Sequence, residues 1–133
     1  FLAHTAAEFL FNSNILHKLN VVIPVPFSKE RAFQPVYEVA KVIGQKIGVN
    51  TDLKYVYKNN SSEMKNVLSR QKKDILGRSI QIASSRYKGQ NVLLFDDLFC
   101  SGSTLAAVSK ALKRVGRVKN IYALTLTKTR TKQ

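Results

Sequence analysis

Two adjacent carboxylates, Asp96 and Asp97, are followed after two residues by the turn Cys100-Ser101-Gly102-Ser103-Thr104. Gly102 permits a backbone conformation that directs several N–H groups at one point, and the hydroxyls add further donors. Neighbouring carboxylates repel each other unless a ligand uses them, and the hydroxyls of a ribose or a magnesium ion are natural partners. The segment therefore predicts a phosphate site beside a sugar or a metal ion.

The turn on its own has a simpler explanation, because Ser103 or Thr104 would also serve as the N-cap of a following helix. The other common phosphate motifs do not fit. The chain has neither G-x-x-x-x-G-K-[ST] nor G-x-G-x-x-G. An acidic pair of the receiver type would explain the carboxylates and leave the turn unexplained. The carboxylates and the turn together favour a ligand site.

A strand and a helix must position these residues. The apolar run NVLLFDD predicts a strand over 91–97, and STLAAVSKALKRVG predicts a helix over 103–116 that Gly116 ends. The expected inward side chains of this helix are Leu105, Val108, Ala111, Leu112 and Val115. In parallel sheets ligands bind at the carboxyl ends of the strands, and a helix N-terminus attracts anions.

In the rest of the chain, segments with the apolar spacing of a helix alternate with segments typical of a strand. We expect an opening helix over 5–19, interrupted near 12–14, with Ala6, Phe9, Leu10, Ile15, Leu16 and Leu19 inward. Further strands are predicted over 20–25, 52–58, 78–83 and 118–129, and a helix runs from Pro35 to Gly48. In 52–58 we expect Leu53, Tyr55 and Tyr57 to alternate with Lys54, Val56 and Lys58. This order predicts an α/β fold with a mostly parallel central sheet flanked by helices.

The length of 133 residues predicts a single domain over 1–133. One cysteine excludes an internal disulfide framework and a zinc site made of several thiolates. No apolar run approaches the roughly 18 residues that a membrane span needs. The opening segment lacks the basic start of a secretory signal, so we expect a reducing, cytoplasmic setting.

The charge is strongly basic, with 22 Lys and Arg against 8 Asp and Glu and a net charge of +14. Eight basic residues and no acidic one follow Asp97. Such a field attracts polyanions, either nucleic acid or a multiply phosphorylated small molecule. A charge that only keeps the protein soluble is the alternative explanation, so the charge alone does not choose a function.

LLFDDLFCSGSTL resembles the phosphoribosyl pyrophosphate (PRPP) signature of type I phosphoribosyltransferases. VVIPVPFSKERAFQP resembles the corresponding segment of the ComF family of competence-type proteins. The resemblance covers about residues 20–127, which would form the Rossmann-like core, with a flexible hood over 59–80 and a basic tail over 127–133.

The resemblance implies a role for each matching residue. Asp96 and Asp97 would hold the ribose hydroxyls, and Leu98, Phe99 and Cys100 to Thr104 would complete the PRPP site around the 5′-phosphate. Pro24, Val25, Pro26 and Phe27 would bind pyrophosphate, and Lys72 and Lys73 of the hood would close over it. Asp96, Asp97, Lys72 and Lys73 are thus the expected catalytic residues. Mg²⁺ would be held mainly by PRPP, with Asp96 and Asp97 as the candidate protein ligands.

Three classes of function stay open. The first is a transferase that moves phosphoribose from PRPP to a nitrogen acceptor, a nucleobase or an amine, as in nucleotide metabolism. The second is a non-catalytic ComF-type accessory protein of DNA uptake that uses the PRPP pocket or binds single-stranded DNA through its basic surface. The third is a partner-binding domain with a vestigial pocket. Neither the acceptor nor pairing into a homodimer can be predicted from the sequence.

Overall fold

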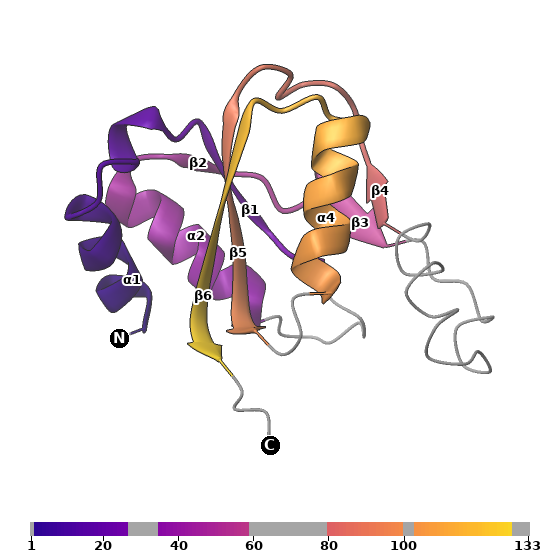
Figure 1. Ribbon diagram of the computed structural model, residues 1–133. Coiled ribbons are helices and arrows are strands. Elements are labelled where there is room, and N and C mark those ends of the chain that lie inside the picture. The colour runs from indigo at the N-terminus through magenta and orange to yellow at the C-terminus, as the bar shows by residue number, and fades with distance from the viewer. Residues whose placement is uncertain (1, 27–34, 59–79, 100–102, 129–133) are drawn as a thin grey trace, which may run out of the picture.

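The computed structural model describes residues 2–26, 35–58, 80–99 and 103–128 (Figure 1). Its main sheet has four parallel strands in the order β2-β1-β5-β6, and β3 and β4 form a separate antiparallel pair. The elements are α1 (Leu2–Phe11), a 3-10 turn (Leu16–Lys18), β1 (Val21–Pro24), α2 (Pro35–Ile47), β2 (Asn50–Thr51), β3 (Val56–Lys58), β4 (Ile80–Ile82), β5 (Asn91–Phe99), α4 (Ser103–Arg114) and β6 (Asn120–Lys128). The predicted mostly parallel sheet flanked by helices is confirmed.

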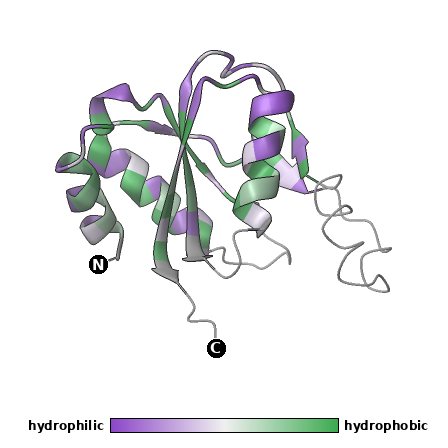
Figure 2. Ribbon diagram, viewed as in Figure 1, coloured by the Kyte–Doolittle hydropathy of each residue, from purple (hydrophilic) through white to green (hydrophobic). Residues whose placement is uncertain are grey.

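The sheet is covered on both faces. Leu93 and Phe95 of β5 pack on the side of α1 and α2, whereas Val92 and Leu94 pack on the side of α4, β3 and β4. All four side chains are buried, which explains why the strand is a continuous apolar run rather than an alternating one. In Figure 2 the strands are hydrophobic between the helices, and α4 becomes hydrophilic toward its carboxyl end.

Helix α2 lies very close to the sheet. Its predicted inner face packs in the core with α1, and Gly48, at φ 73°, ends the helix in a left-handed conformation. A Cβ at Gly44 would lie 2.0 Å from Oγ1 of Thr51 and 2.8 Å from the carbonyl oxygen of Val49. Only glycine fits there, so α2 and β2 are in direct contact.

The opening helix begins earlier than predicted, at Leu2, and ends at Phe11, before the separate 3-10 turn Leu16–Lys18. One of its predicted inward residues is also different. Phe9 is 63% exposed, so its predicted core position is wrong. Ala3, Ala6 and Leu10 are buried at spacings of three and four residues, which is the stripe that faces α2. Phe9 lies about 100° around the helix from Leu10 and falls outside that stripe.

The predicted strand over 52–58 is wrong in extent. The chain forms β2 before Asp52 and β3 after Tyr55, because the backbone N–H of Lys54 donates to Oδ1 of Asp52 at 3.1 Å and turns the chain out of the main sheet. The alternation is also different. Val56 is buried and Tyr57 is exposed, so Val56 and Lys58 share the inner face of β3.

Two tyrosines hold the connection between β2 and β3 in place. The Tyr87 hydroxyl donates to Oδ2 of Asp52 at 2.6 Å, and the Tyr55 hydroxyl donates to the carbonyl oxygen of Ser84 at 2.7 Å. The two rings meet edge to face with centroids 4.6 Å apart. We call Asp52, Tyr55 and Tyr87 the tyrosine corner.

The end of α4 also departs from expectation. Val115 is 57% exposed rather than inward, because the helix ends at Arg114. The helix therefore ends two residues before Gly116, its predicted stop, and Arg117 is left-handed at φ 53°. Gly116 is needed for close packing, since a Cβ would lie 2.9 Å from both the Leu112 carbonyl oxygen and the Tyr55 hydroxyl. Among the described segments, no helix is long and apolar enough to cross a membrane.

Candidate functional site

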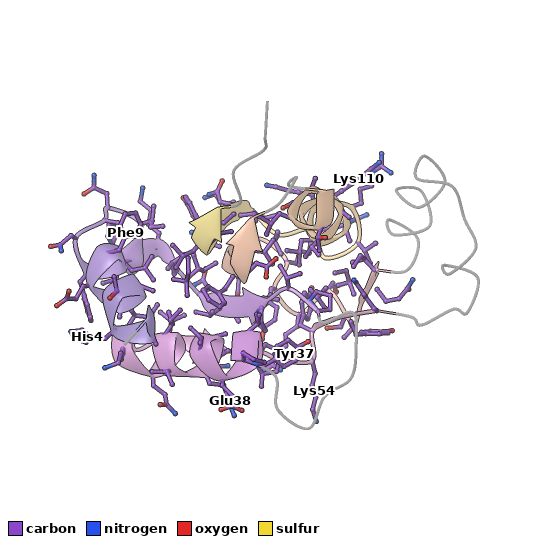
Figure 3. All side chains as sticks on the ribbon, turned by 90° about the horizontal axis from the view of Figure 1, so that it is seen from below. His4, Phe9, Tyr37, Glu38, Lys54 and Lys110 are labelled. Carbon is purple, nitrogen blue, oxygen red and sulfur yellow. The ribbon has the colours of Figure 1, made fainter. Side chains whose placement is uncertain are left out.

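The carboxyl ends of β1 and β5 meet at one edge of the sheet, and α4 begins there (Figures 1 and 3). Pro24 pairs with Phe95, and the backbone N–H of Val25 donates to the Phe95 carbonyl oxygen at 2.8 Å. Pro24, Val25 and Pro26 are buried. The predicted pyrophosphate segment therefore lies directly beside the end of the apolar run that leads into Asp96.

Strand β5 continues through both carboxylates to Phe99, two residues beyond its predicted end. Asp96 pairs with Thr125 of β6, and the pairing continues to Phe99 with Lys128. Because side chains alternate along a strand, Asp96 follows Val92 and Leu94 onto the face that carries α4 and β3. Its half-buried carboxylate is thus fixed by regular strand geometry rather than by a loop.

Helix α4 directs its N-terminus at the same edge. It has no acidic residue in its first turn and has Lys113 and Arg114 in its last turn, which matches the helix dipole at its carboxyl end. The first backbone N–H groups of a helix have no partner within the helix, and together with the positive end of the dipole they favour an anion near Ser103 and Thr104. The geometry supports an anion beside a carboxylate.

The sequence analysis did not identify Lys58 as a candidate residue of this edge. Lys58 is half-buried at the end of β3, where the negative charge of Asp96 acts on it. Burial lowers the pKa of the Lys58 ammonium, and the nearby Asp96 carboxylate opposes this shift. With Val56 assigned to the inner face, alternation would have placed Lys58 there too. Because Tyr55 and Tyr57 were expected to point inward, Lys58 was expected on the opposite, outer face.

The predicted site residues divide into three groups. Pro24, Val25, Pro26, Asp96 and Thr104 are described and lie at this edge. Asp97, Leu98, Phe99 and Ser103 have backbone positions in β5 or at the start of α4. Phe27, Lys72, Lys73, Cys100, Ser101 and Gly102 lie outside the described residues, as does the predicted hood except for Ile80.

Among the described side chains of this edge, Asp96 is the carboxylate that could bind a magnesium ion. Among the described side chains no three His, Cys, Asp or Glu residues come together. Mg²⁺ in phosphate-handling sites is commonly held by one or two carboxylates together with phosphate oxygens and water. The carboxylate of Asp96 fits such an ion only if a phosphorylated ligand supplies most of the remaining oxygens.

The parallel sheet and this anion-favouring edge agree with a family match over almost the whole chain. Residues 3–132 match the phosphoribosyl transferase domain, so the chain belongs to that family. It is similar to competence protein ComFC of Bacillus subtilis (strain 168), with 24% identity over 107 residues. That match covers 80% of this chain and 43% of ComFC, so the chain spans less than half of that relative.

Solved structures share the fold at low sequence identity. An adenine phosphoribosyltransferase superposes with a TM-score of 0.61 at 11% identity, covering 96% of this chain and 69% of that one. Phosphoribosylpyrophosphate synthetase from Mycobacterium smegmatis gives 0.60 at 15% identity, covering 95% and 33%. A hypoxanthine phosphoribosyltransferase from Staphylococcus aureus gives 0.55 at 15%, covering 96% and 61%. These similarities confirm the predicted fold class.

Proposed function

We propose that this domain binds PRPP with Mg²⁺ at the carboxyl edge of the sheet and transfers its phosphoribosyl group to a nitrogen acceptor. The observation that carries the proposal is the position of Asp96, held in β5 beside the N-terminus of α4, in a chain of the phosphoribosyl transferase family. A carboxylate next to an anion-favouring helix end suits a ligand with a diol at one end and a phosphate at the other.

In this proposal each group of residues binds a different part of PRPP. Asp96 and Asp97 accept hydrogen bonds from the ribose hydroxyls, and the segment Cys100–Thr104 binds the 5′-phosphate. Pro24–Phe27 lies along the pyrophosphate, and Lys72 and Lys73 supply positive charge over it. Bound Mg²⁺ supplies charge compensation to the departing pyrophosphate.

The reaction breaks the bond between the anomeric carbon and the pyrophosphate oxygen and forms a carbon–nitrogen bond, and the acceptor releases a proton. Its transition state has oxocarbenium character, so fixing the ribose and stabilising the departing anion are the tasks of the protein. The acceptor class is a nucleobase or an amine.

Calorimetry with PRPP and Mg²⁺ tests the proposal. We expect the wild type to bind and the double variant Asp96→Asn/Asp97→Asn to lose most of its affinity, because an amide cannot replace the charged acceptor. Asp52→Asn is the matched control, since this carboxylate is held by Tyr87 in the tyrosine corner. Unchanged affinity in the double variant would refute the site. A screen of pyrophosphate release across nucleobases and amines then identifies the acceptor.

A second candidate function, binding of single-stranded nucleic acid, is favoured by a basic surface away from this edge. Two loops meet there. The N–H of Gly89 donates to the Arg117 carbonyl oxygen at 2.9 Å, and that of Lys119 donates to Gln90 at 2.8 Å. The exposed cations that these loops and the end of α4 contribute are Arg86, Lys88, Lys113, Arg114, Arg117 and Lys119. No acidic residue occurs in 86–95 or after Asp97.

This second function predicts a salt-dependent affinity. Each phosphate neutralised on a single strand contributes about −0.7 to the slope of log affinity against log salt. We expect the triple variant Lys88→Gln/Arg114→Gln/Lys119→Gln to reduce both the affinity for an oligonucleotide and that slope. Lys41→Gln/Lys46→Gln/Lys54→Gln removes the same charge from exposed positions elsewhere. Equal losses in both variants would indicate a general charge effect and contradict a defined surface.

A further inference from the structure

The two edges of the main sheet differ (Figure 1). Strand β2 is short, Asn50–Thr51, and the chain leaves it through the turn at Asp52. Strand β6 is nine residues long and pairs with β5, and among the described strands none lies on its other side. A long edge strand presents a row of backbone N–H and C=O groups with which a further strand can pair.

Strand β6 has few of the features that usually block a sheet edge, which are charged side chains, proline and bulges. The sequence NIYALTLT, residues 120–127, contains neither a charged residue nor a proline. The pairing with β5 keeps one register from Asn91 with Asn120 to Phe99 with Lys128. Ala123, in the middle of β6, is exposed and has a small side chain. The strand therefore leaves room for a neighbour.

The charge distribution favours a second copy of this chain as that neighbour. The chain has a net charge of +14, so two copies repel each other over most of their surfaces. The uncharged run 120–127 is a place where two copies can approach with little repulsion. A partner recognised by its negative charge would instead be attracted to exposed cations such as Lys113 and Arg114.

Apolar side chains near this edge would be covered by the same contact. Tyr122, Leu124 and Leu126 of β6 lie on the sheet face that carries α1, and all three are only partly buried. On α1, Phe9 is 63% exposed and Phe11 is 55% exposed. Figure 3 shows Phe9 on the side of the molecule where β6 lies, opposite α2. Exposed apolar side chains beside an open strand are typical of an interaction surface.

We propose that two copies of this chain associate through β6, which pairs antiparallel with β6 of the second copy about a two-fold axis at Leu124. A two-fold axis perpendicular to the sheet makes identical edge strands antiparallel and joins the two sheets into one. The same axis keeps α1 of both copies on one face of the joined sheet. This inference is independent of the proposed PRPP site, which lies at the carboxyl ends of the strands.

The residues of β6 favour this register over its neighbours. Residues that lie opposite each other share a face of the sheet, so an axis at Leu124 pairs that leucine with itself and Tyr122 with Leu126. It also places Lys128 opposite the uncharged Asn120. An axis one residue earlier, at Ala123, would instead leave Leu126 opposite Asn120. The axis at Leu124 therefore pairs every apolar residue of that face with another.

Analytical ultracentrifugation of the wild type and two matched variants tests the association. We expect a dimer whose share rises with protein concentration and with salt, because salt screens the repulsion between two basic chains. Ala123→Lys places a charge at the edge and is expected to raise the dissociation constant at least about 10-fold. Tyr57→Lys adds the same charge at an exposed residue of β3 and is expected to have a much smaller effect.

Disulfide cross-linking with oxidised glutathione, in a Cys100→Ser background, tests the register. Leu124→Cys is expected to give a cross-linked dimer, since the two cysteines would face each other across the axis. Tyr122→Cys is the matched control, because its two cysteines would lie four residues, about 13 Å, apart along the strands. A mixture of Tyr122→Cys and Leu126→Cys is expected to cross-link, since these positions lie opposite each other.

Several results would overturn the proposal. A wild type that sediments as a monomer at every concentration has no such interface. Equal dissociation constants for Ala123→Lys and Tyr57→Lys would indicate a general charge effect, and cross-linking of Tyr122→Cys alone as fast as Leu124→Cys would indicate a different contact. Thermal melting of each variant separates a loss of association from a loss of folding, and the cysteine variants serve if Ala123→Lys does not fold.

Discussion

Asp52, between β2 and β3, and Asp96, in β5, are two carboxylates with different surroundings. Asp52 uses one oxygen to accept from the Tyr87 hydroxyl at 2.6 Å and the other to accept from the backbone N–H of Lys54 at 3.1 Å. Both donors are neutral and belong to the fixed framework. Asp96 is half-buried in β5 near the edge where β1 and β5 end, and its negative charge acts on the Lys58 ammonium.

This difference indicates which carboxylate serves the fold and which suits a ligand. Two neutral donors from within the fold satisfy Asp52 and leave it little to offer an incoming molecule. Asp96 lies half-buried at the carboxyl edge of the sheet, where the proposed function assigns it to the ligand. The tyrosine corner is therefore expected to determine stability, and Asp96 to determine the affinity of the proposed PRPP site.

The largest effect on stability is expected at Leu94, which precedes Asp96 in β5 and packs in the same cluster as the tyrosine corner. Leu94 is fully buried in β5 and packs in the cluster that also holds Tyr55, Val56 and Tyr87. We expect Leu94→Ala to lower the free energy of unfolding by about 2–5 kcal/mol, because it leaves a cavity under α4. Urea denaturation measures this loss. Phe9→Ala, at a position 63% exposed, is the control and should change stability far less.

Replacing each carboxylate by its amide tests the comparison directly. Asp52→Asn is expected to lower stability by about 1–2 kcal/mol and to leave PRPP affinity within about twofold of wild type. Asp96→Asn is expected to do the reverse, with a smaller loss of stability than Asp52→Asn and PRPP affinity lowered at least about 10-fold. Thermal melting and calorimetry on the same samples measure both quantities. A loss of affinity in Asp52→Asn equal to that in Asp96→Asn would abolish the distinction.

Gly116 extends the tyrosine corner to the end of α4. A Cβ there would lie 2.9 Å from the Tyr55 hydroxyl and from the Leu112 carbonyl oxygen, so Gly116→Ala must displace both atoms or shift the backbone at the end of α4. We expect a loss of about 1–3 kcal/mol in stability, as for other overpacked sites. Val115→Ala, at the exposed neighbouring position, is expected to change stability by about 0.5 kcal/mol or less. Similar melting temperatures for the two variants would contradict the contact.

The smallest effect concerns the hydroxyl of Tyr87. Tyr87→Phe removes its hydrogen bond to Asp52 and is expected to cost about 1 kcal/mol at pH 7. Burial, the hydrogen bond and the charge of Asp52 raise the pKa of Tyr87 to about 12 from its ordinary value of 10.0. The stabilisation is complete below pH 10, where the hydroxyl is protonated in both states, and is lost as pH rises toward 12, since the unfolded chain ionises first.

Denaturation between pH 9 and 12 checks this last expectation, and the decline in stability should be shallower in Tyr87→Phe than in wild type. Tyr57→Phe, at an exposed tyrosine, is the control and should retain the wild-type slope. Equal slopes in wild type and Tyr87→Phe would show that Tyr87 does not carry the effect.

Long periodic segments could be predicted from the sequence. The inner face of α2, from Val36 to Ile47, and the continuous apolar run of β5 are where the spacing placed them, because each segment packs one stripe or two faces against a large core. The turn between β5 and α4 was assigned to the carboxyl edge of the sheet by the same logic, and Asp96 lies there.

Short segments whose geometry depends on a tertiary contact could not be predicted. The segment 52–58 alternates in type, yet the Asx turn at Asp52 divides it and the tyrosine corner buries Tyr55 out of register with Tyr57. Lys58 was missed for that reason. Val115 was assigned inward by helical spacing, but the helix ends one residue earlier. In each case a hydrogen bond or a helix end decided the outcome, and periodicity does not encode either.

The close contact of Gly44 with Thr51 fixes the distance between α2 and β2, so a larger side chain at Gly44 would tilt the helix about this point. Gly44 lies nine residues, about 14 Å of helix, from Pro35, where α2 starts near the carboxyl edge. A tilt of about 4° at Gly44 would move the start of α2 by about 1 Å. One methyl group introduced at Gly44 would therefore misalign the end of the helix that lies near the carboxyl edge of the sheet.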